Sequence, residues 1–270
     1  MNTIPLNATI TKNGFKIKGH KYWCYYVTKK CLNCNNVTYQ CRQNNSQHKD
    51  NCYCSRKCQS INRHKKVDIK GYEILKQKDT PEFTYLLGLI ASDGYVMYPP
   101  KFAHYQCSIY SNDVDVLNSL VNHFGGFVKS SKNSKWVLNN IKFVEYLRDN
   151  GFVNKKSLVL DVGKWFNELQ FDNQCSFIRG VFDGDGTICK NKRNEWRVAI
   201  ISGSKHFLDM IKQFCSGGVI YKDRNAYSLQ FNKNKDKLAF LDLIYDKKTL
   251  CLERKYNCYI QFKNEYQNII

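Results

Sequence analysis

The 270-residue sequence contains no long apolar run. No segment approaches the roughly 18–20 consecutive apolar residues of a membrane-spanning helix, and the first 20 residues lack the apolar core of a signal peptide. Acidic residues are also scarce: 23 Asp and Glu face 42 Lys and Arg, giving a formal net charge of +19, which excludes an acidic or neutral surface. With 43% hydrophobic residues the chain can still build a core. We therefore expect a soluble intracellular protein of one to two domains.

The excess positive charge is concentrated near the N-terminus. Residues 1–70 hold 14 Lys and Arg against 2 acidic residues, whereas residues 71–270 hold 28 against 21. A basic field of this size attracts polyanions, and 14% aromatic residues favour nucleic acid as the partner. An acidic membrane surface is the alternative, but no segment has the pattern of a basic amphipathic anchor helix.

The cysteines divide the chain at the same place. Seven of the 13 lie before residue 70, and an odd total without a signal peptide argues against a disulfide framework. The spacing of Cys31 with Cys34, and of Cys54 with Cys58, suits two thiolate pairs around a tetrahedral Zn²⁺. We predict a basic zinc-binding module over 1–70 whose structural metal is held by these four cysteines.

The stretch CLNC, followed about twenty residues later by YCSRKC, resembles treble-clef zinc fingers over residues 22–64. Other side chains in reach could replace a ligand, namely Cys24, Cys41, Cys52, His48 and His64. Basic residues of the module are expected to contact DNA phosphates or to form a solvated face: Lys29, Lys30, Arg56, Lys57, Arg63, Lys65 and Lys66.

From residue 80 onward the sequence repeats with an offset of 92 residues. LLGLIASDG at 86–94 returns as IRGVFDGDG at 178–186, KKSLVL at 155–160 as KKTLCL at 247–252, and GGFV at 125–128 as GGVI at 217–220. Three separate segments with one offset indicate a duplicated unit. We expect halves over 71–165 and 166–270.

Each copy predicts the same order of elements. The opening helix is capped by Thr80 with Pro81 at its first position in the first copy, and both opening helices end at Asp-Gly, where glycine suits a left-handed C′ position. The expected strands are 106–110, 127–131 and 135–138, then 197–201, 219–222 and 227–231; the expected helices are 113–124, capped near Asn112, 141–150, 205–214, capped at Ser204, and 235–245. The predicted fold is α+β, a pseudo-two-fold αββαββα duplication with two four-stranded antiparallel sheets.

Small residues form a stripe on each opening helix: Gly88, Ala91 and Ser92 in one, Gly180 and Gly184 in the other. Such stripes allow close helix packing, which would bring Asp93 and Asp185 together. Two carboxylates at helix C-termini are unfavourable without a counter-ion, because they repel each other and oppose the helix dipole. A divalent cation such as Mg²⁺ removes both penalties, and paired carboxylates of this kind support phosphodiester hydrolysis.

These two motifs resemble the signatures of a single-chain LAGLIDADG homing endonuclease, over about residues 80–265. The resemblance implies that the motif helices form the interface between the halves. It also implies that Asp93 and Asp185, with the adjoining Gly94 and Gly186, hold catalytic Mg²⁺, and that the sheets bind a long double-stranded DNA site as a monomer. The first motif departs from the pattern with Ala91 where the second keeps Asp183.

The resemblance further implies a basic pocket beside each acid. Lys156 and Lys248 match by position, each 63 residues after its Asp, with Lys155 and Lys247 as alternatives. Lysine there would stabilise the phosphate charge that develops in the transition state. Candidate DNA-contacting residues on the sheets and their turns are Lys101, Gln106, Ser108, Tyr110, Lys190, Lys192, Arg193, Arg197, Lys222 and Arg224.

The function predicted from the sequence is site-specific double-strand cleavage of DNA. The alternative is a non-cleaving binder on the same fold, either an intron RNA maturase or a DNA-binding regulator. The retained pair Asp93 and Asp185 argues for cleavage.

Overall fold

The computed structural model describes residues 8–11, 14–18, 23–32, 34–41, 58, 73–99, 104–130, 134–152, 160 and 162–267. The chain divides into two compact units, Met1–Ile69 and Lys70–Ile270. Among the described helices, none combines the length and apolar character that a membrane span requires.

The first unit contains a four-stranded antiparallel sheet in the order β1-β2-β3-β4. Its strands are β1 (Ala8–Thr11), β2 (Gly14–Lys18), β3 (Trp23–Lys30) and β4 (Val37–Cys41). In the turn between β3 and β4, the Cys31 N–H donates to the Asn36 carbonyl at 2.8 Å, and the Asn35 N–H donates to the Cys31 carbonyl at 2.9 Å. Asn35 has φ 60°, a left-handed conformation that Asn tolerates. This sheet was not predicted, because its short strands mix polar and apolar residues without clear alternation.

The second unit contains the duplicated fold. Its first half consists of α2 (Pro81–Asp93), β5 (Gly94–Met97), β6 (Gln106–Tyr110), α3 (Val114–Phe124), β7 (Phe127–Lys129), β8 (Lys135–Leu138) and α4 (Ile141–Asp149). Its second half consists of α6 (Gly163–Asn167), α7 (Phe171–Asp185), β9 (Gly186–Lys190), β10 (Trp196–Ser202), α8 (Lys205–Cys215), β11 (Val219–Asp223), β12 (Ala226–Phe231), α9 (Asn234–Tyr245) and α10 (Glu253–Gln267). The sheet orders, β5-β6-β8-β7 and β9-β10-β12-β11, are equivalent, so the predicted α+β duplication is confirmed. Helices α6 and α10 lie outside the predicted pattern.

The predicted helix starts are largely confirmed. Thr80 Oγ1 accepts a hydrogen bond from the Phe83 N–H at 3.3 Å, and Ser204 Oγ accepts one from the Phe207 N–H at 3.2 Å. The cap expected near Asn112 lies one residue later, at Asp113, whose side chain makes no capping hydrogen bond.

The expected left-handed glycines at the ends of the motif helices were wrong. Gly94 has φ −78° and Gly186 has φ −83°, both extended, because each is also the first residue of a strand. Glycine is needed at these two positions because a side chain would collide with the preceding helix. A Cβ on Gly94 would lie 2.6 Å from Ile90 Cα, and one on Gly186 would lie 2.7 Å from Phe182 Cγ.

Each sheet of the second unit has a helix-covered face and an open face. The helix-covered faces supply core residues such as Val96, Ile109 and Trp136 in one half and Val198 and Leu229 in the other. Because side chains alternate along a strand, their neighbours in register form the open faces. The open face of the first half carries Tyr95, Met97, Gln106, Ser108, Tyr110, Phe127, Lys129, Lys135 and Val137; that of the second carries Thr187, Cys189, Arg197, Ala199, Ile201, Val219, Tyr221, Ser228 and Gln230.

Candidate active site and nucleic-acid interface

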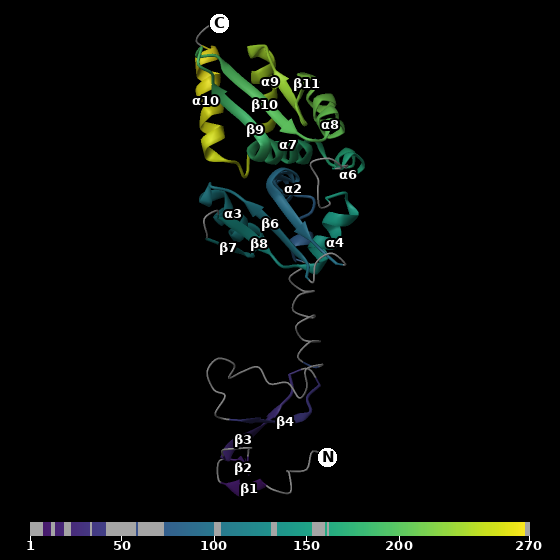
Figure 1. The fold of residues 1–270 in the computed structure, drawn as a ribbon, viewed down its shortest axis with the longest axis vertical. Coiled ribbons are helices and arrows are strands. Elements are labelled where there is room, and N and C mark those ends of the chain that lie inside the picture. The colour runs from purple at the N-terminus through teal and green to yellow at the C-terminus, as the bar shows by residue number, and fades with distance from the viewer. Residues whose placement is uncertain are drawn as a thin grey trace. The chain divides into compact units, whose positions relative to one another are not determined.

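Helices α2 and α7 lie side by side between the two sheets of the second unit (Figure 1). A Cβ on Gly88 would lie 2.8 Å from Gly180 Cα, and a Cβ on Gly180 would lie 2.9 Å from Gly88 Cα. The reciprocal distances indicate a pseudo-two-fold axis between the helices. Only glycine at both positions permits this separation, as the small-residue stripes predicted.

Asp93 and Asp185 are the last residues of α2 and α7, and both are exposed. A Cβ on Gly184 would lie 3.0 Å from Asp93 Oδ2, so the Asp93 carboxylate lies against the residue that precedes Asp185. Both carboxylates also act electrostatically on the same ammonium, that of Lys255. The two acids therefore gather at one end of the helix pair, where the helix dipoles add negative potential. This set of hard oxygen donors fits a divalent cation such as Mg²⁺.

Lys255, on α10, places a buried cation at the end of α7. The residue is 4% exposed, and its Nζ donates to the carbonyls of Phe182 at 2.7 Å and Asp183 at 2.8 Å. These carbonyls belong to the last turn of α7, where a helix leaves carbonyls short of donors; the Phe182 carbonyl also accepts a hydrogen bond from the Gly186 N–H. Burial lowers the pKa of Lys255 to about 8, while the charges of Asp183, Asp93 and Asp185 act in the opposite direction.

The two predicted carbonyl ligands differ in their surroundings. Gly94 is buried, and its N–H donates to the Ile90 carbonyl. The Gly186 carbonyl accepts a hydrogen bond from Lys255 Nζ at 2.5 Å. An ammonium group and a divalent cation on one oxygen repel each other, so the carboxylates of Asp93 and Asp185 are the better placed donors.

Asp183 has a structural environment unlike that of Asp185 two residues later. It is 3% exposed, and its carboxylate accepts hydrogen bonds from Tyr85 Oη at 2.9 Å, Tyr245 Oη at 2.7 Å and the Leu252 N–H at 2.7 Å. Burial raises the pKa of Asp183, and these three hydrogen bonds act against that shift. The bond from Tyr85 of α2 crosses the interface between the halves. Asp183 therefore joins α2, α7 and the segment that leads into α10.

Arg179 holds in place the segment between α9 and α10, which carries the predicted basic residues of the second half. Its guanidinium is buried at 1% exposure and donates to the carbonyls of Leu250 and Ile244, both at 2.8 Å. Within the segment, Lys248 Nζ lies 3.5 Å from Glu253 Oε1 and 4.0 Å from the centre of the Tyr256 ring.

Burial lowers the pKa of Lys248, but Cys251 and Glu253 outweigh it, so that the pKa of Lys248 is raised and the side chain stays cationic. The alternative Lys247 pairs with Asp172 at 3.2 Å. The equivalent residues of the first half, Lys156 and Lys155, lie outside the described residues.

Those of the predicted DNA-contacting residues that the structure describes fall into three groups. Gln106, Tyr110 and Arg197 lie on the open faces, and Lys192, Arg193 and Arg224 lie in hairpin turns. Ser108 is in register with the open face but is buried, at 1% exposure. Lys190 and Lys222 lie in register with the helix-covered face, and Lys190 Nζ pairs with Glu265 of α10 at 2.9 Å. Lys101 is outside the described residues.

Three of the predicted zinc ligands come together in the first unit. The sulfur atoms of Cys31, Cys34 and Cys58 all lie within 4.8 Å of one another, and the Cys34 and Cys58 sulfurs are 3.8 Å apart. A tetrahedral Zn²⁺ with Zn–S bonds of about 2.3 Å separates its sulfur ligands by roughly 3.8 Å, so the cluster fits this metal. Cys54, the fourth predicted ligand, lies outside the described residues.

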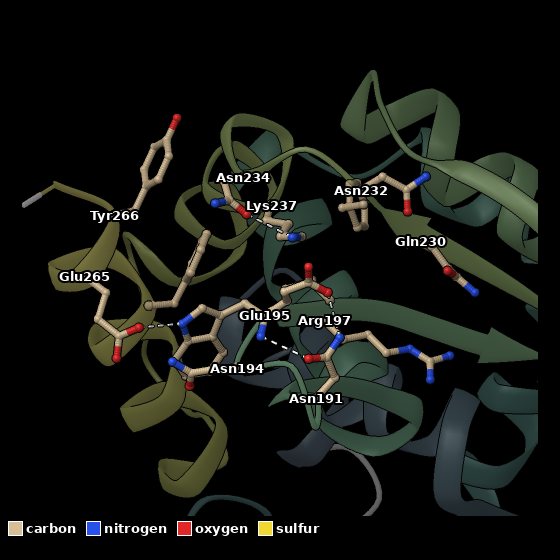
Figure 2. Close-up of a pocket in the computed structure, with 14 residues that line it drawn as sticks. Asn191, Asn194, Glu195, Arg197, Gln230, Asn232, Asn234, Lys237, Glu265 and Tyr266 are labelled. Atoms are coloured by element: carbon tan, nitrogen blue, oxygen red, sulfur yellow. Dashed lines mark hydrogen bonds between the residues drawn. The ribbon is translucent and has the colours of Figure 1, made fainter. Parts of the chain in front are cut away.

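Two cavities border these features. One of about 390 Å³ lies between the halves and is lined by Asp93, Asp113, Gly184 and Arg254 among others; Arg254 Nε bonds Asp113 across the interface at 3.1 Å. A second cavity of about 650 Å³ lies at the outer end of β10 and β12, between α9 and α10 (Figure 2). Its amide-rich lining includes Asn191, Asn194, Gln230, Asn232 and Asn234.

Sequence reasoning missed Lys255, the open-face lysines Lys129 and Lys135, and the buried role of Asp183. The signal for the open-face lysines was present, because each alternates with a core residue along its strand. Lys255 follows the duplicated region, where the repeat offers no counterpart to point to it.

Comparison with known proteins adds a family match within the second half. Residues 172–245 match the LAGLIDADG-like domain family. No curated protein matches the chain significantly.

Several solved structures of homing endonucleases are similar. A structure of mesophilic variants of the homing endonuclease I-DmoI is 17% identical with a TM-score of 0.46, covering 62% of this chain and 96% of that chain. I-DmoI in complex with DNA and Mn is 18% identical with a TM-score of 0.44, covering 62% and 97%. A mutant of I-SmaMI is 14% identical with a TM-score of 0.47, covering 67% and 89%.

Proposed function

We propose that the chain is a site-specific double-strand DNA endonuclease of the LAGLIDADG homing type. The observation that carries the proposal is the reciprocal contact of Gly88 and Gly180, which gathers Asp93 and Asp185 at one end of the α2/α7 pair. The net charge of +19 and the LAGLIDADG-like match over residues 172–245 support it. Two acids related by a pseudo-two-fold axis suit the two antiparallel strands of a duplex, one for each phosphodiester.

The carboxylates of Asp93 and Asp185 would hold the catalytic Mg²⁺. When bound, the metal lowers the pKa of a water molecule and neutralises charge on the phosphate. Lys255 restrains the end of α7 through its carbonyl hydrogen bonds, which fixes where the Asp185 carboxylate points. Lys248, and Lys156 by the repeat, supply positive charge for the phosphate in the transition state.

The open sheet faces would bind the flanking duplex. Arg197 and the hairpin-turn residues Lys192, Arg193 and Arg224 would contact phosphates or base edges, as would Gln106 and Tyr110 in the other half. The basic first unit, folded around Zn²⁺ at Cys31, Cys34, Cys58 and Cys54, would add further phosphate contacts.

The test is cleavage of a randomised duplex library by the full chain. We expect a discrete set of sequences cut on both strands with Mg²⁺, and no cutting when the metal is chelated. Specific binding without cutting, at any metal concentration, would identify the non-cleaving binder instead. The absence of any sequence preference in both binding and cutting would refute both functions.

A further inference from the structure

Exposed apolar side chains gather on the open sheet faces. Of the nine large hydrophobic residues that are exposed in the described part of the chain, six lie on these faces: Tyr95, Tyr110, Phe127, Ile201, Val219 and Tyr221. Phe127 is 49% exposed, Val219 45% and Ile201 43%, although a monomer gains nothing by exposing them together. Grouped exposure of this kind marks a binding surface.

Four of these residues form two pairs at equivalent positions of the halves. Phe127 and Val219 are separated by the repeat offset of 92 and begin the edge strands β7 and β11. Tyr110 and Ile201 each follow the residue that pairs with the glycine after a motif aspartate. We call Tyr110, Phe127, Ile201 and Val219 the apolar quartet. The pseudo-two-fold axis relates the two members of each pair.

The surroundings of the quartet are cationic, which commits the surface to DNA rather than to an apolar protein partner. Lys135 Nζ donates to Tyr110 Oη at 3.3 Å, and Lys129 pairs with Lys135 in the adjoining strand. Arg197 lies on the open face of the other half, four residues before Ile201 in the same strand. Such a face attracts the phosphate backbone on either side of a groove.

Base edges in the major groove differ in one apolar feature. Only thymine presents a methyl group there, while the other bases present donors and acceptors alone. An apolar side chain against guanine or cytosine would remove water from polar groups without replacing their hydrogen bonds. Residues of this kind on a DNA-reading face therefore favour thymine and disfavour guanine and cytosine.

We propose that the apolar quartet contacts thymine 5-methyl groups, so that the recognised duplex carries thymines at mirror-related positions of its two half-sites. This inference rests on the proposed binding of DNA to the open faces. It adds which bases those faces select.

The experiment uses the full chain and a duplex selected from the randomised library. Each thymine is replaced in turn by deoxyuridine, which keeps base pairing and removes only the methyl group, and the Kd is measured by fluorescence anisotropy without divalent metal. We expect Kd to rise about fourfold for each contacted methyl, the factor that burial of one methyl-sized group supplies. The sensitive positions should occur in both half-sites.

Variants of the apolar quartet identify which side chain contacts which thymine methyl group. Phe127→Ala should abolish the uracil effect at the thymine it contacts in one half-site, and Val219→Ala should abolish it at the mirror-related thymine of the other, while the effect at the thymines contacted by Tyr110 and Ile201 remains. Val114→Ala is the matched control: Val114 is 44% exposed but lies on α3, away from the open faces, so its variant should keep the full uracil effect. Thermal unfolding by circular dichroism confirms that all three variants fold.

Specific binding that is unchanged by every uracil substitution would overturn the inference and leave the proposed endonuclease intact. Equal loss of the effect in Val114→Ala would also overturn it. A chain with no sequence-specific DNA binding at all would overturn the proposed function together with this inference.

Discussion

Lys255 shows how one buried charge shapes the candidate active site. An ammonium group at 4% exposure is costly unless its donors are satisfied, and here they are occupied by carbonyls of the last turn of α7. The same cation offsets part of the negative potential from Asp93 and Asp185. Its position therefore contributes both to the stability of α7 and to the proximity of the two acids.

Replacement of Lys255 by Met should lower the free energy of unfolding by about 3 kcal/mol, because it removes a donor from the buried carbonyls of Phe182 and Asp183 and a charge that balances nearby acids. The matched control is Lys263→Met on the same helix, whose ammonium pairs with Asp242 at 2.9 Å and is 31% exposed. An exposed pair contributes about 1 kcal/mol or less. Urea unfolding of both variants tests this, and equal losses would contradict the assigned role of Lys255.

At the residue scale, the sequence was sufficient to predict Asp93 and Asp185 as candidate metal ligands, but it was not sufficient to predict the contacts of Asp183. Asp93 and Asp185 stand out because the sequence repeats around them. The interaction of Asp183 with Tyr85 and Tyr245 joins residues 98 and 62 positions apart, and no local pattern encodes such a contact. The second motif therefore keeps an acid whose purpose becomes visible only in three dimensions.

At the scale of elements, the approach of α2 to α7 depends on two glycines. Gly88→Ala or Gly180→Ala should destabilise the second unit by about 3 kcal/mol or more, because the added Cβ would meet the backbone of the opposite helix. Gly217→Ala is the control, since its nearest contact would be the Cys215 carbonyl oxygen at 3.8 Å. Thermal unfolding distinguishes them. Tolerance of alanine at both interface positions would show that the helices are farther apart than described.

The hydrogen bonds that attach α10 to β9 and β10 predict that the stability of the fold depends on pH. Hydrogen bonds from Lys190, Trp196 and Gln261 lower the pKa of Glu265 to about 2. The unfolded chain therefore binds more protons than the folded chain between about pH 4.5 and pH 2, and this contribution to stability is lost as the pH falls through that window.

Glu265→Gln should flatten the stability profile in that window relative to the wild type. Glu168→Gln, at the exposed end of α6, should leave the profile close to wild type. Urea unfolding at a series of pH values provides the measurement. A slope that is unchanged in Glu265→Gln would exclude the proposed anchoring.

Element types and order were predictable because two signals agreed: apolar periodicity and the repeat. The register of the strands was not predictable from the sequence. Lys190 and Lys222 were expected to contact DNA, yet a single-residue shift along a strand exchanges the open face for the helix-covered one. Helix α10 escaped prediction because it has no counterpart in the first copy.

At the scale of the whole molecule, we expect the two units to be stabilised by different forces. The second unit buries a large aromatic and aliphatic core, whereas the cysteine cluster of the first unit suits stabilisation by metal. We expect about one Zn²⁺ per chain, and loss of that metal in Cys34→Ser. Cys258→Ser, on α10, should retain it. Elemental analysis of the purified variants measures their zinc content. Full zinc content in Cys34→Ser would contradict the assignment of the cysteine cluster as the zinc site.

The halves are equivalent in layout but not in interior chemistry. The second motif helix carries the buried Arg179 and Asp183, where the first carries Leu87 and Ala91 at the positions 92 residues earlier. Both copies thus keep the interface glycines and the terminal acids, while Arg179 and Asp183 have no charged counterpart in the first motif helix.

The most direct test of the central claim is single-turnover cleavage of the selected duplex with Mg²⁺ by wild type, Asp93→Asn and Asp185→Asn, with Asp209→Asn as an exposed control on α8. If Asp93 and Asp185 jointly hold the catalytic metal, wild type and the control will cut both strands, while each motif variant binds the duplex with unchanged Kd and loses double-strand cleavage. Cleavage of both strands at the wild-type rate by either motif variant would contradict the account.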